Sequence, residues 1–287
     1  MTLKKSAIYL LTVNYYSASY LEKLIASIAL NTNLVEALII VNNSPEDSSI
    51  YRLQNDWVII LEAGENLGFG KACNLGLKWI GDRSPNSPVW LINPDAYFLA
   101  DSLPQAAQFL TKNPDISILG TTVLEPSGKL WFGGGIFNAK KGIIKANEFL
   151  SEEEWERELL PTDWVSGCSM LINLQNFYNL PQFDGDYFLY YEDFDFCRRY
   201  LKAGYKIALT PQIGVIHEPS SITSKNSDLQ VQEGIYSYLL SLEKHTSKSV
   251  LFYRLFRITL ASLTFLSLNK FKAVVKYYRR LLNLDPP

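Results

Sequence analysis

Residues 7–30 read AIYLLTVNYYSASYLEKLIASIAL, an apolar run followed by a polar turn and then by apolar residues at helical spacing. The run at 7–13 has the length and composition of a buried strand. Leucine and isoleucine recur every three or four residues within 19–30, which is typical of an amphipathic helix. A buried strand that leads directly into a helix is the repeating unit of α/β domains, so this stretch predicts a sheet covered by helices.

The alternation of strand and helix continues through the first half of the chain. Further strands are predicted at 37–41, 58–61 and 89–92, and a further helix at 71–80. Helical connections of this kind join parallel strands, so the sheet is expected to be mainly parallel. The region 116–216 then mixes short strands with a glycine-rich loop and an acidic helix.

The formal net charge of −2 conceals an uneven distribution along the chain. Residues 244–280 contain nine Lys or Arg and no Asp or Glu, which leaves 18 basic and 29 acidic residues elsewhere. A basic tail on an acidic body predicts an anionic partner for the tail. Nucleic acid is not expected, because the basic run is confined to a hydrophobic segment without a recognition motif.

The number and spacing of the cysteines and the length of the first apolar run indicate the cellular compartment. Cys73, Cys168 and Cys197 are odd in number and unevenly spaced, so they define neither a disulfide framework nor a zinc site. A reducing compartment is therefore expected. The run at 7–13 is too short for the apolar region of a signal peptide, which agrees with a cytoplasmic location.

Polar residues follow each of the four strands predicted in the first half. Any one of these clusters is what an ordinary turn contains. In an open α/β sheet, however, ligands bind at the carboxyl ends of the strands, so the clusters together predict a nucleotide-binding edge. The residues are Asn14 and Tyr15, Asn42 to Ser44, Glu65 to Gly70, and Asn93 to Asp95.

Residues 192–195 read EDFD and follow five apolar residues, at the start of a predicted helix that ends at Gly204. A carboxylate where an apolar segment meets a helix is partly desolvated, which raises its pKa and makes it a better base. The alternative is that these acids only complement the helix dipole, with Asp195 and Arg199 paired one turn apart.

In their order along the chain, these clusters resemble those of the family 2 inverting glycosyltransferases, and are closest to the rhamnosyltransferase-like branch. The resemblance spans roughly residues 7–223. It implies an A-type glycosyltransferase fold, which is Rossmann-like, with a mixed, mainly parallel sheet and a C-terminal helical extension. Its remaining motifs are Asp163-Trp164-Val165-Ser166-Gly167, Arg198-Arg199 and His217-Glu218-Pro219-Ser220-Ser221.

The resemblance also implies a division into domains. A glycosyltransferase catalytic domain is expected over 1–225, with a nucleotide-binding half at 1–115 and an acceptor half at 116–225. Residues 226–287 then form a basic amphipathic helical tail.

Catalytic and metal-binding roles follow from the same resemblance. Asp193 matches the catalytic base, which takes the proton of the acceptor hydroxyl in a single displacement with inversion, although neighbouring Glu192 and Asp195 are not excluded. Asp95 and His217 match residues that hold a divalent cation, Mg²⁺ or Mn²⁺, on the donor diphosphate. The alternatives are an Asn-Pro-Asp turn and a structural histidine.

The nucleotide-sugar donor is expected to contact the strand-end residues. Asn42 stands where the family has an aspartate that reads the base, and its amide can still accept a hydrogen bond. The glycines of the 66–70 loop are expected to permit close approach of the backbone to the nucleotide. Lys71 is expected to supply a positive charge, because Cys73 replaces an arginine. The full set is Asn14, Tyr15, Asn42, Asn66, Gly68, Gly70, Lys71, Asn74 and Asn93.

Trp164 and Gly167 match the loop that lines the acceptor and the donor sugar. An aromatic ring there can stack on a sugar face, while packing of Trp164 in the core is an equal alternative. Arg198 and Arg199 are expected either to balance the acidic cluster or to reach a phosphate.

Together these roles predict transfer of a sugar from a nucleoside-diphosphate donor to a hydroxyl of a growing, lipid-linked surface polysaccharide. Rhamnose from dTDP-rhamnose is favoured by the resemblance alone. Two alternatives stay open. One is a degenerate protein that binds nucleotide or glycan without turnover; the other is a sugar nucleotidylyltransferase, which should carry a basic, glycine-rich loop where this chain has residues 14–17.

The tail allows two interpretations. The longest charge-free run, 258–269, is shorter than the roughly 20 residues that cross a bilayer. The segment 249–280 therefore either packs on the catalytic domain or lies in a membrane interface on the cytoplasmic side, and its many aromatic residues favour the second. His245 is expected to be solvated. The residues expected to face anionic lipid are Lys270, Lys272, Lys276, Arg279 and Arg280.

Overall fold

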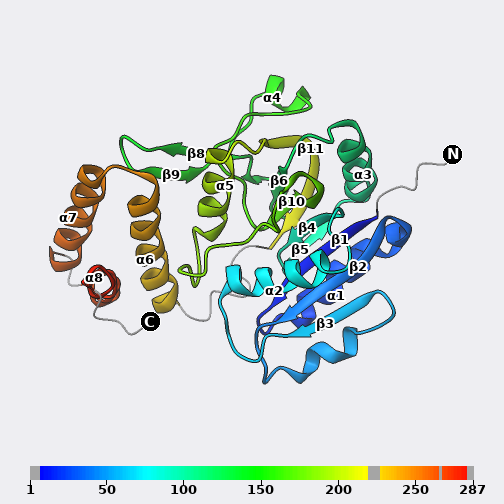
Figure 1. The fold of residues 1–287 in the computed structure, drawn as a ribbon, viewed down its shortest axis with the longest axis horizontal. Coiled ribbons are helices and arrows are strands. Elements are labelled where there is room, and N and C mark those ends of the chain that lie inside the picture. Colours follow the sequence, from blue (N-terminus) through cyan, green and yellow to red (C-terminus); the bar gives the residue numbers. More distant parts are fainter. Residues whose placement is uncertain (1–6, 219–226, 265–266, 283–287) are drawn as a thin grey trace.

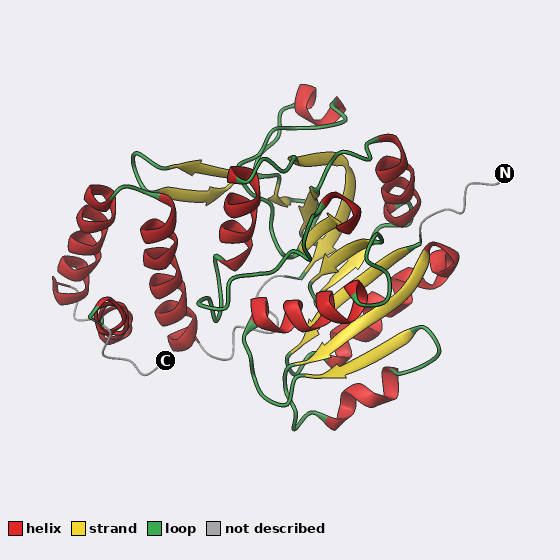
Figure 2. Ribbon diagram, viewed as in Figure 1, coloured by secondary structure: helices red, strands yellow, loops and turns green. Residues whose placement is uncertain are grey.

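The computed structural model describes residues 7–218, 227–264 and 267–282 (Figure 1). A twisted sheet with helices packed around it forms one part of the molecule, and the C-terminal helices stand beside it (Figure 2). The predicted α/β fold is confirmed.

Within the described residues, the central sheet has nine strands. They are β1 (Ile8–Asn14), β2 (Val35–Asn42), β3 (Val58–Glu62), β4 (Pro88–Ile92), β5 (Ala96–Phe98), β6 (Ile118–Leu124), β7 (Leu130–Phe132), β10 (Ser169–Asn173) and β11 (Ile207–His217). The order is β3-β2-β1-β4-β10-β6-β11-β5, with β7 paired to β6. β10, β5 and β7 run against the common direction of the other strands, so the sheet is mixed but mainly parallel. A separate hairpin consists of β8 (Gly135–Asn138) and β9 (Ile143–Ala146).

Helices cover both faces of the sheet because its central strands are apolar throughout. Every residue of β1 is buried, and successive side chains enter opposite faces, Leu10 on one side and Leu11 on the other. α1 (Ala18–Ile28) and α3 (Ser102–Lys112) pack on the first face. α2 (Phe69–Gly81) and α5 (Glu192–Lys202) pack on the second. A short helix, α4 (Glu152–Glu156), lies outside these layers.

Two strand pairings position the residues discussed below. β11 extends well beyond the predicted strand and pairs with β5, so that His217 lies opposite Ala96. β10 is inserted antiparallel beside β4, so that Ser169 lies opposite Ile92. Both pairings bring the second half of the chain to the carboxyl end of β4.

The C-terminal helices are α6 (Ser227–His245), α7 (Lys248–Thr264) and α8 (Leu268–Leu281). α6 packs beside α5 (Figure 1). It is fixed by hydrogen bonds from the Ser237 hydroxyl to the Leu189 carbonyl (2.8 Å) and from the Tyr238 hydroxyl to the Gly142 carbonyl (2.6 Å). The tail thus packs on the body of the protein. None of the described helices is both long and apolar enough to span a bilayer.

One expectation about the tail is wrong. His245 is not solvated: its Nε2 lies 2.8 Å from Oδ1 of the fully buried Asp195. Two of the cations expected to face lipid are paired within the protein, Lys276 with Glu233 at 2.6 Å and Arg280 with Glu243 at 2.6 Å. The expected boundary at 225/226 and the motif residues 219–221 lie outside the described residues.

Candidate active site

The pairing of β5 with β11 brings Asp95 and His217 together. His217 lies opposite Ala96, and its Nε2 is 3.2 Å from Oδ1 of Asp95. Both side chains are almost completely buried. Nδ1 of His217 is also buried and has no hydrogen-bond partner among the described residues.

Asp95 and His217 are arranged as two ligands of a divalent cation would be. Neighbouring ligand atoms on an octahedral ion with bonds of about 2.1 Å lie roughly 3 Å apart, close to the observed separation. In the described part of the chain, no group of three or more His, Cys, Asp or Glu side chains is arranged to hold a metal. The remaining ligands would therefore be phosphate oxygens and water, which Mg²⁺ sites commonly use.

The environment of His217 has opposing effects on its pKa. Burial lowers the pKa of the imidazole, but Cys168 and Asp95 raise it, to about 10. The ring packs edge-on against Trp131, with 4.7 Å between the ring centroids. A cation bound through Nε2 would therefore displace a proton from His217.

A single turn connects Asp193 to the segment that contains Asp95. The amide of Gly167 donates to Oδ2 of Asp193 at 2.9 Å. The carbonyl of the next residue, Cys168, accepts a hydrogen bond from the Asn93 amide at 3.0 Å. Two successive residues thus contact the predicted base on one side and the predicted metal-binding turn on the other. The turn thus connects Asp193 to the segment that contains Asp95, and a site shared by the two residues stays a prediction.

The backbone is strained immediately before Asp193. Tyr190 and Tyr191 have φ angles of 69° and 64°, in the left-handed region that non-glycine residues rarely adopt. Such residues cost roughly 1–3 kcal/mol each and persist only where their surroundings fix them. This bend leads into α5 and places Glu192 and Asp193 in its first turn.

The three acids of this turn have different surroundings. Asp195 is fully buried and held by Arg199 (2.6 Å) and His245 (2.8 Å), so the predicted pair with Arg199 is confirmed. Glu192 is buried, and burial and the charge of Asp193 raise its pKa to about 8. Burial also raises the pKa of Asp193, against the opposing effect of hydrogen bonds from its neighbours. Asp193 alone is partly exposed, which favours it as the base.

The buried side chains of Asn14 and Asn42 are hydrogen-bonded to each other. The Asn14 amide donates to Oδ1 of Asn42 (3.0 Å) and to Ser44 (3.1 Å), and the Asn42 amide donates to Glu62 (3.1 Å). Both asparagines are fully buried. Their amides therefore fix the loops after β1 and β2, whereas the neighbouring Tyr15 ring is 43% exposed at this edge.

Contacts within the protein determine the conformation of the glycine-containing loop at 66–70. Asn43 donates to Asn66 at 2.9 Å and accepts from the Leu67 amide at 2.8 Å, which anchors the loop. At Gly68, with φ of 79°, a Cβ would lie 2.2 Å from the Phe188 carbonyl oxygen. The close approach that this glycine permits in the described structure is to the segment leading to α5, and its contact with a nucleotide stays a prediction.

The side chain of Asn74 is hydrogen-bonded to the segment that leads to α5. Its amide donates to the Phe183 carbonyl (2.8 Å) and its oxygen accepts from the Phe183 amide (2.7 Å). Both polar groups are used, so the expected donor contact is replaced by a structural one. Gly70 packs against Phe183 as well, at 3.1 Å for a Cβ. Lys71 is exposed on the first turn of α2, and Asn93 is partly exposed after β4.

The residues expected on the acceptor side also interact with other residues of the protein. Arg198 pairs with Asp163 at 3.0 Å, so it balances an acid within the chain. Trp164 packs against Phe132 (5.1 Å between centroids), and its indole nitrogen lies 2.1 Å from where a Cβ of Gly135 would stand. These contacts support core packing for Trp164. Gly167 lies at the site itself, through its hydrogen bond to Asp193.

Sequence reasoning missed three residues of the site: Asn43, Trp131 and Cys168. Asn43 stood in a strand-end cluster, but only its partner Asn66 was singled out. Trp131 and Cys168 carry no motif, and only the antiparallel insertion of β10 and the length of β11 bring them beside His217. Two cavities, of about 400 and 490 Å³, lie elsewhere, against α7 and between α5 and the end of α6.

Comparison with known proteins agrees with this arrangement. The sequence profile described as glycosyl transferase family 2 matches residues 9–172. An N-acetylglucosaminyl-diphospho-decaprenol L-rhamnosyltransferase of Mycobacterium tuberculosis is 26% identical over 75% of this chain and 76% of its own length. The low-salt glycan biosynthesis hexosyltransferase Agl10 of Haloferax volcanii is 22% identical over 84% of this chain and 77% of its own.

The fold has a solved counterpart. The mannosyltransferase PcManGT from Pyrobaculum calidifontis, determined in complex with GDP-Man and Mn²⁺, aligns with all of this chain and 77% of its own, with a TM-score of 0.56 and 13% sequence identity. The expected A-type glycosyltransferase fold is therefore confirmed.

Proposed function

The chain belongs to glycosyl transferase family 2, and from this premise we propose that it transfers a sugar from a nucleoside-diphosphate donor to a hydroxyl of a saccharide acceptor, with inversion. One observation carries the proposal. Gly167 and Cys168 connect a partly exposed carboxylate, Asp193, to the turn that bears Asp95, so that a base and a diphosphate-binding group share one site.

Asp193 acts as the base in this proposal. It accepts the proton of the acceptor hydroxyl while that oxygen bonds to the anomeric carbon, and the bond from this carbon to the diphosphate breaks on the opposite face. The Gly167 amide donates to Oδ2 of this carboxylate at 2.9 Å and the Phe194 amide donates to Oδ1 at 2.7 Å, so both oxygens are held in a fixed orientation. A raised pKa brings the base nearer to neutral pH, where proton transfer is more efficient.

Asp95 and His217 hold a divalent cation, Mg²⁺ or Mn²⁺, in the same proposal. The cation would stabilise the negative charge of the departing nucleoside diphosphate. Among the predicted donor contacts, Tyr15, Asn66 and Lys71 are exposed and Asn93 is partly exposed, so they remain available. Asn14, Asn42 and Asn74 support the loops.

The finer assignment rests on the relatives. The name of the mycobacterial relative supports rhamnose as the transferred sugar and a lipid-linked saccharide as the acceptor. The choice of dTDP-rhamnose as the donor rests on the family resemblance alone. A lipid-linked acceptor and a basic tail support work at the cytoplasmic face of a membrane, with the tail in peripheral contact. We retain 1–225 and 226–287 as the proposed catalytic domain and tail.

The test is transfer and donor hydrolysis across a panel of nucleotide sugars, with Mg²⁺, Mn²⁺ or chelator. We expect turnover with dTDP-rhamnose and its loss in chelator. Turnover only with another donor would contradict the rhamnose assignment, and indifference to chelator would contradict the metal. Binding of nucleoside diphosphate without turnover of any sugar would support the degenerate alternative.

A further inference from the structure

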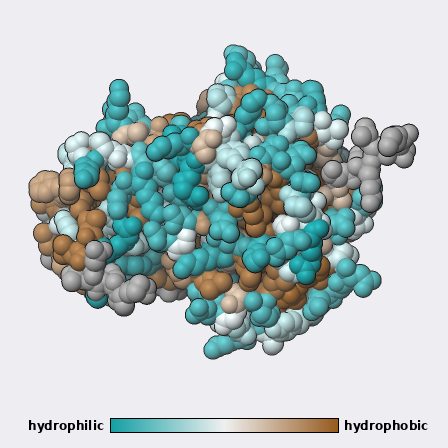
Figure 3. Space-filling model, in the orientation of Figure 1, coloured by the Kyte–Doolittle hydropathy of each residue, from teal (hydrophilic) through white to brown (hydrophobic). Residues whose placement is uncertain are grey.

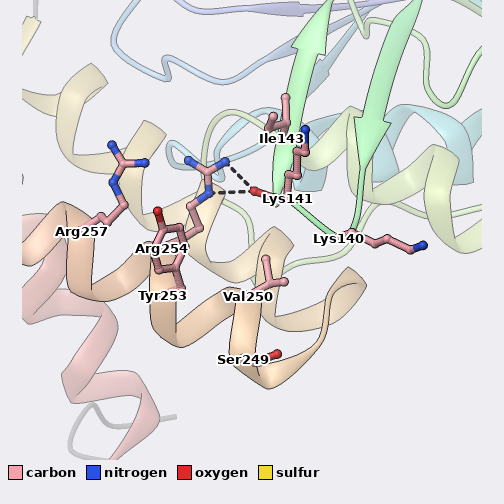
Figure 4. Close-up of a pocket in the computed structure, with 8 residues that line it drawn as sticks. All are labelled: Lys140, Lys141, Ile143, Ser249, Val250, Tyr253, Arg254 and Arg257. Carbon is pink, nitrogen blue, oxygen red and sulfur yellow. Dashed lines mark hydrogen bonds between the residues drawn. The ribbon is translucent and has the colours of Figure 1, made fainter.

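A cavity of about 400 Å³ lies where the β8–β9 turn meets α7 (Figure 4). Four of its lining residues are cationic: Lys140 and Lys141 from the turn, and Arg254 and Arg257 from the helix. Tyr253 and Ser249 add hydroxyl groups. The cavity thus joins cations of the catalytic body to cations of the tail.

The wall of this cavity is held in place by the chain. Arg254 donates through Nε to the Lys141 carbonyl at 2.9 Å, and its Nη2 donates to the same oxygen (Figure 4). Tyr238 of α6 donates to the next carbonyl, that of Gly142. A Cβ on Gly142 would stand 2.9 Å from Val250, so turn and helix are in close contact. The cations are therefore presented on a fixed surface.

Carboxylates of the described residues do not neutralise the charge of this cavity. Lys244, Lys276 and Arg280, on the inner side of the tail, all pair with carboxylates. In contrast, none of the four cavity cations forms an ion pair with another described residue; Arg254 binds only a neutral carbonyl, and Arg257 lies near the Tyr253 ring. An uncompensated basic cavity of this kind is suited to a phosphate.

An apolar stripe runs beside the cavity along α7. Phe252, Phe256, Leu260 and Leu263 recur at helical spacing and are each at least half exposed. Leu251 and Leu255, on another face of α7, are buried against the neighbouring helices. Figure 3 shows the hydrophobic surface gathered at this end of the molecule. A ligand that fits both features has a phosphate head and an apolar chain.

We propose that this cavity binds the phosphate headgroup of an anionic membrane phospholipid, with the apolar stripe of α7 inserted among the acyl chains. The inference rests on the peripheral membrane contact proposed above and deepens it, because it assigns part of the contact to Lys141 in the catalytic body. The lipid would then fix the catalytic body, as well as the tail, against the membrane.

The experiment is flotation of the full-length protein with vesicles of phosphatidylglycerol and phosphatidylcholine or of phosphatidylcholine alone. We expect binding to the anionic vesicles only. In Lys141→Gln/Arg257→Gln, two removed charges should weaken this binding about 30-fold. Lys145→Gln is the matched control, because Lys145 lies on the same hairpin, is exposed and does not line the cavity; it should change binding less than about twofold.

The other outcomes would contradict separate parts of the proposal. Unchanged binding by the double variant would refute lipid binding in the cavity but not the membrane contact of the tail. Absence of binding by the wild type would refute both. Stabilisation by soluble glycerol phosphate that requires Arg257, without vesicle binding, would assign the site to a free phosphate. Donor turnover in solution should be equal in wild type and double variant, so a failure of the proposed enzyme activity is seen separately.

Discussion

At the scale of single residues, the acids of the 192–195 cluster are separated by their contacts. Asp195 anchors α6, Glu192 is buried with a pKa raised to about 8, and Asp193 is oriented by the Gly167 amide. The sequence could place all three near one helix start. The local pattern could not rank them, because their distant partners come from α6 and from the loop before β10.

The raised pKa of Glu192 has a consequence for stability. Between its ordinary value of 4.5 and about 8, the folded protein retains a proton that the unfolded chain has lost, so the free energy of unfolding falls as pH rises. One such proton contributes at most about 1.4 kcal/mol per pH unit. In Glu192→Gln this fall should be smaller when urea unfolding is measured from pH 5 to 8, because only the contributions of other groups with raised pKa values, such as Asp193 and His217, remain. A parallel fall in both proteins would contradict the assignment.

His245 was expected to be solvated, and its buried contact predicts a different behaviour. His245→Ala leaves an oxygen of Asp195 without its partner, which should lower the free energy of unfolding by about 1–3 kcal/mol in urea titrations. Lys248→Ala is the control, because Lys248 is exposed three residues further on, and it should change stability by less than about 0.5 kcal/mol. Equal effects of the two substitutions would contradict the contact.

At the scale of elements, hydrophobic pattern predicted β1 to β4 and the helices between them, because these strands are apolar and three of them, β1, β2 and β4, are buried on both faces. The pattern did not predict β5 or the full length of β11. β5 pairs with β11, and β11 also pairs with β6. These pairings join segments that are distant in the sequence, so the local pattern does not contain them. The amide network of Asn14 and Asn42 was unpredictable for the same reason.

The packing of α2 on β1 gives a test at this scale. A Cβ on Gly76 would lie 2.1 Å from a methyl group of the fully buried Leu11. Gly76→Ala should therefore cost about 1–3 kcal/mol of stability in thermal or urea unfolding. Gly234→Ala in α6 is the matched control: its Cβ would meet Tyr190 at 3.7 Å, so the better helix propensity of alanine should leave stability unchanged or increased. If Gly76→Ala were as stable as the control, this packing would be wrong.

At the scale of the whole molecule, the antiparallel insertion of β10 and the long β11 return the second half of the chain to the edge formed by the first. Asp95 and His217 are far apart in the sequence and meet through the pairing of β11 with β5, while Asp193 contacts Gly167, just before β10. The resemblance to family 2 predicted that these residues form one site, whereas composition and periodicity could not. The tail adds a basic end, in which Lys276 and Arg280 pair with carboxylates of α6.

The central claim is that Asp193 is the base of a site it shares with Asp95. The most direct measurement is single-turnover transfer by Asp193→Asn, with donor binding measured in parallel and Glu192→Gln as the control. We predict that Asp193→Asn loses at least about 100-fold in rate while its affinity for the donor changes little, since general-base catalysis contributes roughly 10²–10⁴-fold. Wild-type turnover by Asp193→Asn would contradict the account.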